Sequence, residues 1–205
     1  MKKGIFTLSC LSILFLFAFK LTEITPIAIG SAMPKADVKM KEVMSGKEIT
    51  LAQAKKENGL LVIFSCNTCP YVIKHQNIMI EEGKHAETSK IGCIVVNSNE
   101  GKRDGDDSYD AMKKYAKEQG YTMPYTVDKN SELADAFGAT RTPEVYLFDK
   151  NLKLVYHGAY TDDSDPVNAT KFFLKDAMNE LKDGKVVTIT SAKSVGCTIK
   201  RAAKN

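Results

Sequence analysis

An unbroken apolar stretch, Leu60–Phe64, leads into two cysteines that are separated by two residues. Such a stretch is typical of a strand buried on both faces of a sheet, because no polar residue alternates with the apolar ones. A helix is predicted from Tyr71 onwards. Cys66 is therefore expected where unpaired N–H groups and the positive end of the helix dipole stabilise a thiolate. Cys69 follows close enough to form a disulfide with Cys66.

Three uses of this cysteine pair are open, and a redox pair fits the sequence best. In that use, Cys66 is the exposed thiol that attacks a disulfide, and Cys69 is the more buried thiol that resolves the mixed disulfide. A static disulfide here would close a very short ring, which contributes little loop entropy. A zinc site needs two more ligands, but Cys197 and the histidines form no second paired cluster. Copper(I) suits such soft ligands better. We predict no resident metal and no cofactor.

The N-terminal residues have the pattern of an export signal. Lys2 and Lys3 precede a largely apolar stretch over residues 5–19, and we assign a signal peptide to residues 1–20 without placing its cleavage site. A spanning helix needs roughly 20 apolar residues, so a permanent anchor is less favoured, although an uncleaved segment would tether the chain to a membrane. The protein is expected in the periplasm or outside the cell, where disulfides persist.

Residues 27–205 are predicted to form one α/β domain. Its four cysteines are too few for a fold held together by disulfides. Alternation of strands and helices predicts parallel pairing, and the last two strands are expected to form an antiparallel hairpin. The expected elements are a hairpin over 38–50, strands over 60–64, 91–96, 144–149 and 153–160, and helices after residue 71, around 109–116, over 131–137 and over 166–182. The net charge of +4 is small and the lysines are spread out, so no nucleic-acid surface is predicted.

The segment Phe-Ser-Cys-Asn-Thr-Cys-Pro-Tyr-Val, residues 64–72, resembles the active-site segment of a peroxiredoxin-like branch of the thioredoxin superfamily, of the AhpC/TSA or redoxin type. That branch reads Phe-x-Cys-Asn-His-Cys-Pro-Tyr-Val. Further stretches match it in the same order, at residues 95–99, 137–149, 154–158, 162–164 and 196–200. The resemblance implies a thioredoxin-like fold, with a central mixed sheet flanked by helices, an N-terminal hairpin and an extended C-terminal tail. It also implies an active site supported by Asn67, Thr68, Pro70, Thr142 and Pro143.

The resemblance further implies a cis peptide bond between Thr142 and Pro143, beside the cysteine pair. A cis proline there exposes the backbone of the preceding residue for pairing with a bound peptide. An isolated Thr-Pro sequence would favour the trans form. Thioredoxins also use a buried carboxylate as proton acceptor in the strand before the cysteines, and residues 60–65 contain none. Glu144, directly after this proline, is either a substitute for it or, as we favour, exposed and structural.

Two activities compete for this site. Peroxiredoxins carry Pro-x-x-x-Thr-x-x-Cys, and neither cysteine has Pro and Thr at those distances. The guanidinium of Arg141 need not reach a thiol. We therefore favour thiol–disulfide exchange with protein dithiols and disulfides, or with a thiol electron donor, over peroxide reduction. A Cu(I) metallochaperone, with Cys197 or a histidine as third ligand, is a further alternative.

The segments that depart from the relatives give further expectations. Thr68 replaces a histidine that can carry positive charge beside a thiolate, which predicts a less oxidising protein. Cys197 lies in the tail, where it either folds back as an additional redox thiol, packs inertly or pairs with Cys93. Arg201 replaces an aromatic anchor, which predicts weaker docking of the tail. The acidic segments 101–107 and 161–166 are expected to be solvated turns.

Overall fold

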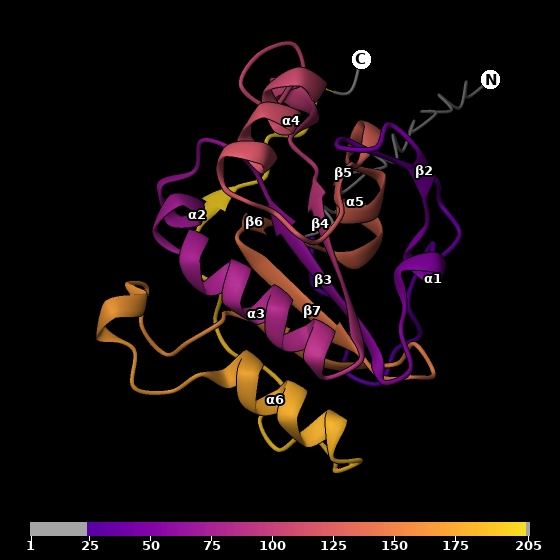
Figure 1. Cartoon of the computed structure of the whole chain (residues 1–205), viewed down its shortest axis with the longest axis vertical. Helices are drawn as coiled ribbons and strands as arrows, with labels where there is room; N and C mark the ends of the chain where they lie inside the picture. Colours follow the sequence, from indigo (N-terminus) through magenta and orange to yellow (C-terminus); the bar gives the residue numbers. More distant parts are fainter. Residues whose placement is uncertain (1–23, 204–205) are drawn as a thin grey trace, which may run out of the picture.

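A seven-stranded mixed sheet forms the centre of the structure, a computed structural model that describes residues 24–203 (Figure 1). The strand order is β2-β1-β5-β4-β3-β7-β8. The central strand β3 (Gly59–Ser65) pairs in parallel with β4 (Ile91–Asn97) and antiparallel with β7 (Glu144–Phe148). The outer strands are β1 (Met40–Glu42), β2 (Glu48–Ile49), β5 (Tyr125–Val127) and β8 (Leu154–Gly158). The expected α/β class, with a mixed central sheet, is confirmed.

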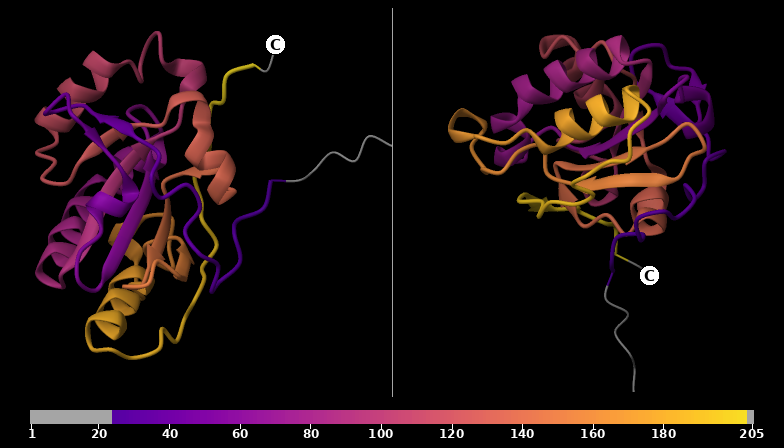
Figure 2. Two further views of the ribbon diagram at one scale, coloured as in Figure 1. Left: turned by 90° about the vertical axis from the view of Figure 1, so that its right-hand side faces the viewer. Right: turned by 90° about the horizontal axis from the view of Figure 1, so that it is seen from below.

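Alternate residues of β3 face two different layers of helices. Leu61 and Ile63 belong to the core on one side, under α3 (Gln76–Thr88), α4 (Tyr109–Glu118) and α6 (Phe173–Lys182). Leu60, Val62 and Phe64 belong to the core on the other side, under α1 (Leu51–Ala54) and α5 (Glu132–Phe137). Figure 2 shows the two helix layers around the sheet. Every residue of β3 is buried, as an unbroken apolar strand requires.

The last helix is shorter than its sequence pattern predicts. Residues Pro166–Asn168 form a single 3-10 turn, and α6 begins only at Phe173. The side chain of Asp162 accepts hydrogen bonds from the backbone of Thr170 and Lys171 at 2.9 and 3.0 Å, which holds the intervening loop in a non-helical conformation. Two further 3-10 turns lie at Glu100–Lys102 and Lys129–Ser131.

The C-terminal tail runs back across the molecule in an extended form, as expected. It first follows the edge of β8, where Ala192 donates to the carbonyl of His157 at 3.1 Å. It then forms β9 (Cys197–Thr198), which pairs antiparallel with β6 (Arg141–Thr142) in a separate small sheet. Figure 1 shows this yellow strand beside α2 (Pro70–Lys74), at the end of the central sheet. The tail therefore reaches the segment that carries the cysteine pair.

The predicted export signal at residues 1–20 lies outside the described residues. Within residues 24–203, no helix is long and apolar enough to cross a membrane.

Candidate active site

Cys66 and Cys69 lie between the end of β3 and the beginning of α2. The helix begins at Pro70, so Cys69, rather than Cys66, is its N-cap residue. Proline favours the first helical position, because its missing N–H has no partner there. Cys66 is only 2% exposed and Cys69 only 4%. The expectation that Cys66 is the exposed thiol at the helix N-terminus is therefore wrong, because Cys69 is the residue that caps the helix and both cysteines are buried beside the tail.

Thr142 contacts both cysteines of the pair. Its Oγ1 lies 3.3 Å from Cys66 Sγ, and its carbonyl oxygen lies 3.2 Å from Cys69 Sγ, which donates to it as a thiol. The peptide bond between Thr142 and Pro143 is cis. Thr68 and Pro70 have exposed side chains, so of the predicted supporting residues it is Thr142 that lies directly against the sulfur atoms.

Cys197 joins the pair as a third thiol. Its side chain packs against the buried cluster of Cys66, Cys69 and Val72, and its backbone pairs with Thr142, which contacts both sulfur atoms of the pair. Cys93 lies elsewhere, in β4, against Gly83 of α3. All four of these cysteines are free thiols. Within residues 24–203, no group of three or more His, Cys, Asp or Glu side chains is arranged to hold a metal ion.

The hydrogen bonds of the site favour a thiolate on Cys69. Donation from the Cys66 thiol, then from the Cys197 thiol and the backbone N–H groups of Val72 and Cys197, lowers the pKa of Cys69 to about 4 against the effect of burial. The carbonyl of Thr142 opposes this shift, because it can accept a hydrogen bond only from the thiol form of Cys69. The four donors together outweigh this single acceptor, so the pKa is lowered. The bond to Cys69 and its own burial raise the pKa of Cys66 well above its ordinary value.

Asn67, between the two cysteines, is held by a buried carboxylate. Its backbone N–H donates to Asp107 Oδ1 at 2.9 Å, and its side-chain amide donates to the carbonyl of Asp106 at 2.7 Å. Its side-chain oxygen accepts from the hydroxyl of Tyr125 at 2.9 Å. Asp107 is 0% exposed. The expectation that residues 101–107 form only a solvated turn is therefore wrong for Asp107, which fixes the backbone of the cysteine loop.

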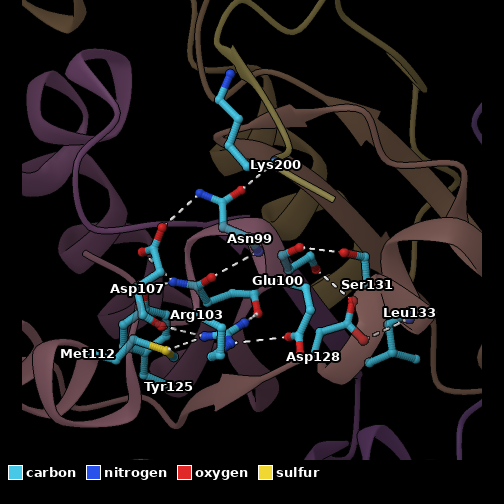
Figure 3. A network of polar contacts seen from close by, with 12 residues as sticks. Asn99, Glu100, Arg103, Asp107, Met112, Tyr125, Asp128, Ser131, Leu133 and Lys200 are labelled. Carbon is cyan, nitrogen blue, oxygen red and sulfur yellow. Dashed lines mark hydrogen bonds and ion pairs between the residues drawn. The ribbon is translucent and has the colours of Figure 1, made fainter. Parts of the chain in front are cut away.

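Asp107 also connects the cysteine loop to the tail. Its carboxylate accepts from Asn97 Nδ2 at 2.7 Å and from Asn99 Nδ2 at 2.9 Å. The other end of the Asn99 side chain accepts from the backbone N–H of Lys200 at 2.8 Å (Figure 3). The sequence signal for this network was the polar segment at the end of the buried strand β4. Its two asparagines, Asn97 and Asn99, are themselves buried.

Glu144, directly after Pro143, is 3% exposed, so the expectation that it lies on the surface is wrong. Its carboxylate accepts from the backbone N–H groups of Thr140 and Arg141 at 2.9 and 3.0 Å, and from His157 Nε2 at 2.7 Å. These contacts hold the loop that leads to the cis proline. His157 is thereby a paired structural residue.

Arginine side chains anchor the tail. The guanidinium of Arg201 donates to Asp135 at 2.6 Å and to the carbonyl of Ala139 at 2.7 Å. Arg201 thus anchors the tail through an ion pair and a backbone hydrogen bond in place of an aromatic contact, and weaker docking than in the relatives stays a prediction. Arg141 donates to the carbonyl of Gly196 at 3.1 Å. Its guanidinium thus contacts the tail.

Comparison with known proteins identifies the family. The curated thiol-disulfide oxidoreductase ResA of Geobacillus thermodenitrificans is 26% identical over 145 residues, which cover 68% of this chain and 74% of that protein. The crystal structure of an uncharacterized conserved protein from Geobacillus kaustophilus is 30% identical, with a TM-score of 0.80 over 87% of this chain and 94% of that one. The thioredoxin domain of a thiol-disulfide oxidoreductase from Bacteroides vulgatus is 17% identical, with a TM-score of 0.55 over 69% of this chain and 95% of that one. The fold is thioredoxin-like. The family model described as Redoxin matches residues 28–172, which is more than half of the chain, and the protein therefore belongs to the Redoxin family.

Proposed function

We propose that this protein is an exported thiol–disulfide oxidoreductase that exchanges disulfides with protein partners through Cys66 and Cys69. Membership of the Redoxin family makes it an oxidoreductase acting on thiol groups, as expected from the sequence. The observation that supports the finer proposal is the placement of the two thiols in one buried cluster against Thr142, whose hydroxyl lies 3.3 Å from Cys66 Sγ and whose carbonyl oxygen lies 3.2 Å from Cys69 Sγ. ResA, the curated relative, is itself named a thiol-disulfide oxidoreductase.

The position of Cys69 at the N-cap of α2, together with the lowered pKa of its thiol, supports an order of attack opposite to the one expected from the sequence. The Cys69 thiolate attacks one sulfur of a substrate disulfide, which forms a mixed disulfide and releases the first substrate thiol. Cys66 then attacks Cys69 Sγ, which releases the second substrate thiol and leaves a Cys66–Cys69 disulfide. Two electrons pass from the protein to the substrate, together with the proton of Cys66, and the second substrate thiolate takes its proton from water. The same steps in reverse would oxidise a dithiol.

The surroundings of the site favour exchange over peroxide reduction. Peroxiredoxin-type chemistry needs an arginine at the reacting thiol, and the guanidinium of Arg141 instead contacts Gly196. Thiol–disulfide exchange needs only two thiols in reach of each other and a lowered pKa on one of them. Cys66 and Cys69 meet both requirements.

The test compares three substrates with the same protein. Reduced protein is mixed with oxidised glutathione, with insulin or with hydrogen peroxide, and the loss of free thiols is followed. We expect fast exchange with the disulfides and oxidation by peroxide at the rate of a free thiol. Substitution of Cys66 or Cys69 by serine should abolish turnover, whereas the matched variant Cys93→Ser, outside the site, should keep it. Peroxide oxidation orders of magnitude faster than that of a free thiol would assign a peroxidase instead.

Export and copper binding are tested separately. The N-terminal pattern of two lysines and an apolar stretch supports export, so the protein should be recovered in the periplasmic or extracellular fraction. Recovery in the cytosol would contradict this part of the proposal. Native mass spectrometry of the exported protein should show no copper, and stoichiometric Cu(I) would favour the metallochaperone.

A further inference from the structure

The tail strand β9 occupies the edge at which the sequence predicted a bound peptide. Cys197 pairs with Thr142 in the antiparallel register of β6 and β9, and the next residues continue the contact, with Ile199 donating to the carbonyl of Thr140 at 3.0 Å. Gly196 fits because it has no side chain, since a Cβ there would lie 2.3 Å from the Thr142 oxygen. The chain thus presents its own cysteine to the pair, in the position of a substrate.

The three cysteines lie in one cluster, in which Cys66 and Cys69 are buried and Cys197 packs against them. Thr142 lies against all three, because its hydroxyl is 3.3 Å from Cys66 Sγ, its carbonyl oxygen is 3.2 Å from Cys69 Sγ and its backbone pairs with Cys197. Cys69 is therefore placed to exchange disulfide partners with the other two thiols.

We propose that Cys197 is a third redox thiol of this site, which takes the disulfide from Cys66 by attacking Cys69 and passes it to an external thiol. The proposal rests on the proposed function only in assigning the first disulfide to Cys66 and Cys69. In the exchange, a Cys69–Cys197 bond forms and the Cys66–Cys69 bond breaks. The electron pair of the broken bond stays on Cys66, which takes up the proton that Cys197 gives up. There is no net oxidation or reduction.

The exposure of the three cysteines favours such a relay for the step that involves an external thiol. Cys66 and Cys69 are almost fully buried, whereas Cys197 is partly exposed. An external thiol can therefore reach Cys197 while β9 stays docked. The resulting step is a second exchange, in which the external thiol attacks Cys197 Sγ, forms a mixed disulfide with it and releases Cys69.

The acidity of Cys197 changes in the direction that the relay requires. Burial and the neighbouring Cys69 raise the pKa of Cys197 to about 11 in the reduced site. When Cys69 is bound in a disulfide, it carries no negative charge and accepts no strong hydrogen bond. The contribution of Cys69 to the raised pKa of Cys197 is then removed. Cys197 becomes a better nucleophile when the Cys66–Cys69 disulfide is present.

The test maps disulfides in the full-length chain after oxidation by glutathione disulfide and trapping of free thiols. We expect Cys66→Ser to form an intramolecular Cys69–Cys197 disulfide, and Cys69→Ser to form no Cys66–Cys197 disulfide. Adding Gly196→Ala to Cys66→Ser should displace β9 and suppress the Cys69–Cys197 disulfide. The matched change Gly105→Ala should not, because a Cβ at Gly105 has no neighbour closer than 4.0 Å.

The variant Cys197→Ser separates this inference from the proposed function. A Cys66–Cys69 disulfide should still form in it, and its reduction by added glutathione should be more than about tenfold slower than in the wild type, because the intramolecular step is lost. If this variant forms no Cys66–Cys69 disulfide, the proposed function fails. If that disulfide forms, either of two results refutes the relay. One is that Cys66→Ser gives no Cys69–Cys197 disulfide, and the other is that oxidised Cys197→Ser is reduced at the wild-type rate.

Discussion

Replacement of Asp107 by asparagine tests whether the buried carboxylate holds the cysteine loop. The carboxylate accepts three hydrogen bonds, from the backbone of Asn67 at 2.9 Å and from the side-chain amides of Asn97 and Asn99 at 2.7 and 2.9 Å. An asparagine side chain has the same shape, but one of its two ends is an N–H₂ group. At least one existing donor would then face another donor in a site with no access to water.

The neighbouring groups cannot easily turn to relieve this conflict. A rotation of the Asn99 amide would bring its oxygen to residue 107, but it would also give up the bond from the Lys200 backbone at 2.8 Å. A hydrogen bond to a charged group contributes about 1.5–3 kcal/mol, and a buried donor without a partner costs about 1–3 kcal/mol. The loss is partly offset because no charge has to be buried. We expect Asp107→Asn to lower the free energy of unfolding by about 2–4 kcal/mol.

The assay is urea and thermal unfolding of the reduced protein, with Asp106→Asn as the matched control. Asp106 is exposed and contributes only its backbone carbonyl to the network, so its variant should stay within about 0.5 kcal/mol of the wild type. For a chain of this size, the change at Asp107 corresponds to a decrease in Tm of about 4–15 °C. If both variants unfold at the same denaturant concentration, the role assigned to the buried carboxylate is refuted.

Three further changes probe the thiols and the tail. The ultraviolet absorbance of the thiolate in reduced protein should persist down to a pH of about 4, the pKa of Cys69, and should vanish at neutral pH in Cys69→Ser. Because this pKa is depressed, the stabilisation that it gives is complete above about pH 8.5 and declines as the pH falls towards 4. Thr68→His should make the protein more oxidising, by about 30 mV for each unit by which it lowers the thiolate pKa, and an unchanged equilibrium with glutathione would contradict this. Arg201→Ala should speed both proteolysis of the tail and alkylation of Cys197, and equal rates in Arg201→Ala and the control Lys200→Ala would count against the anchoring role.

The central strand and the position of the cysteine pair at its end could be predicted because their signals are local. An unbroken apolar stretch is enough to place Leu60–Phe64 in the buried middle of a sheet, and all of β3 is buried. The helix was predicted within one residue of its start, but the wrong cysteine was assigned to its N-terminus, although Pro70 carried the information. Proline is favoured at the first helical position, which makes Cys69 the N-cap and moves the donors of the helix N-terminus from Cys66 to Cys69.

The buried roles of Asp107 and Arg201 could not be predicted, because their partners lie far away in the sequence. Asp107 sits in a run of charged and glycine residues that reads as a solvated turn. It becomes buried only because the cysteine loop and the end of β4 close over it. Arg201 likewise meets Asp135 only after the tail has crossed the molecule. Composition gives the polarity of such segments. The long-range topology decides whether their polar side chains form hydrogen bonds with water or with other groups of the protein.

Thr142 explains how so short a strand as β6 can organise three thiols. Its hydroxyl lies against Cys66, its carbonyl lies against Cys69, and its backbone pairs with Cys197. Docking of β9 thereby places two donors of Cys197, its thiol and its backbone N–H, beside Cys69, where they lower the pKa of Cys69. Thermodynamic linkage makes this effect reciprocal. If docking of the tail stabilises the Cys69 thiolate, the thiolate must bind the tail more tightly than the thiol does, by the same free energy. The ionisation of the cysteine pair and the position of the tail are therefore one coupled equilibrium.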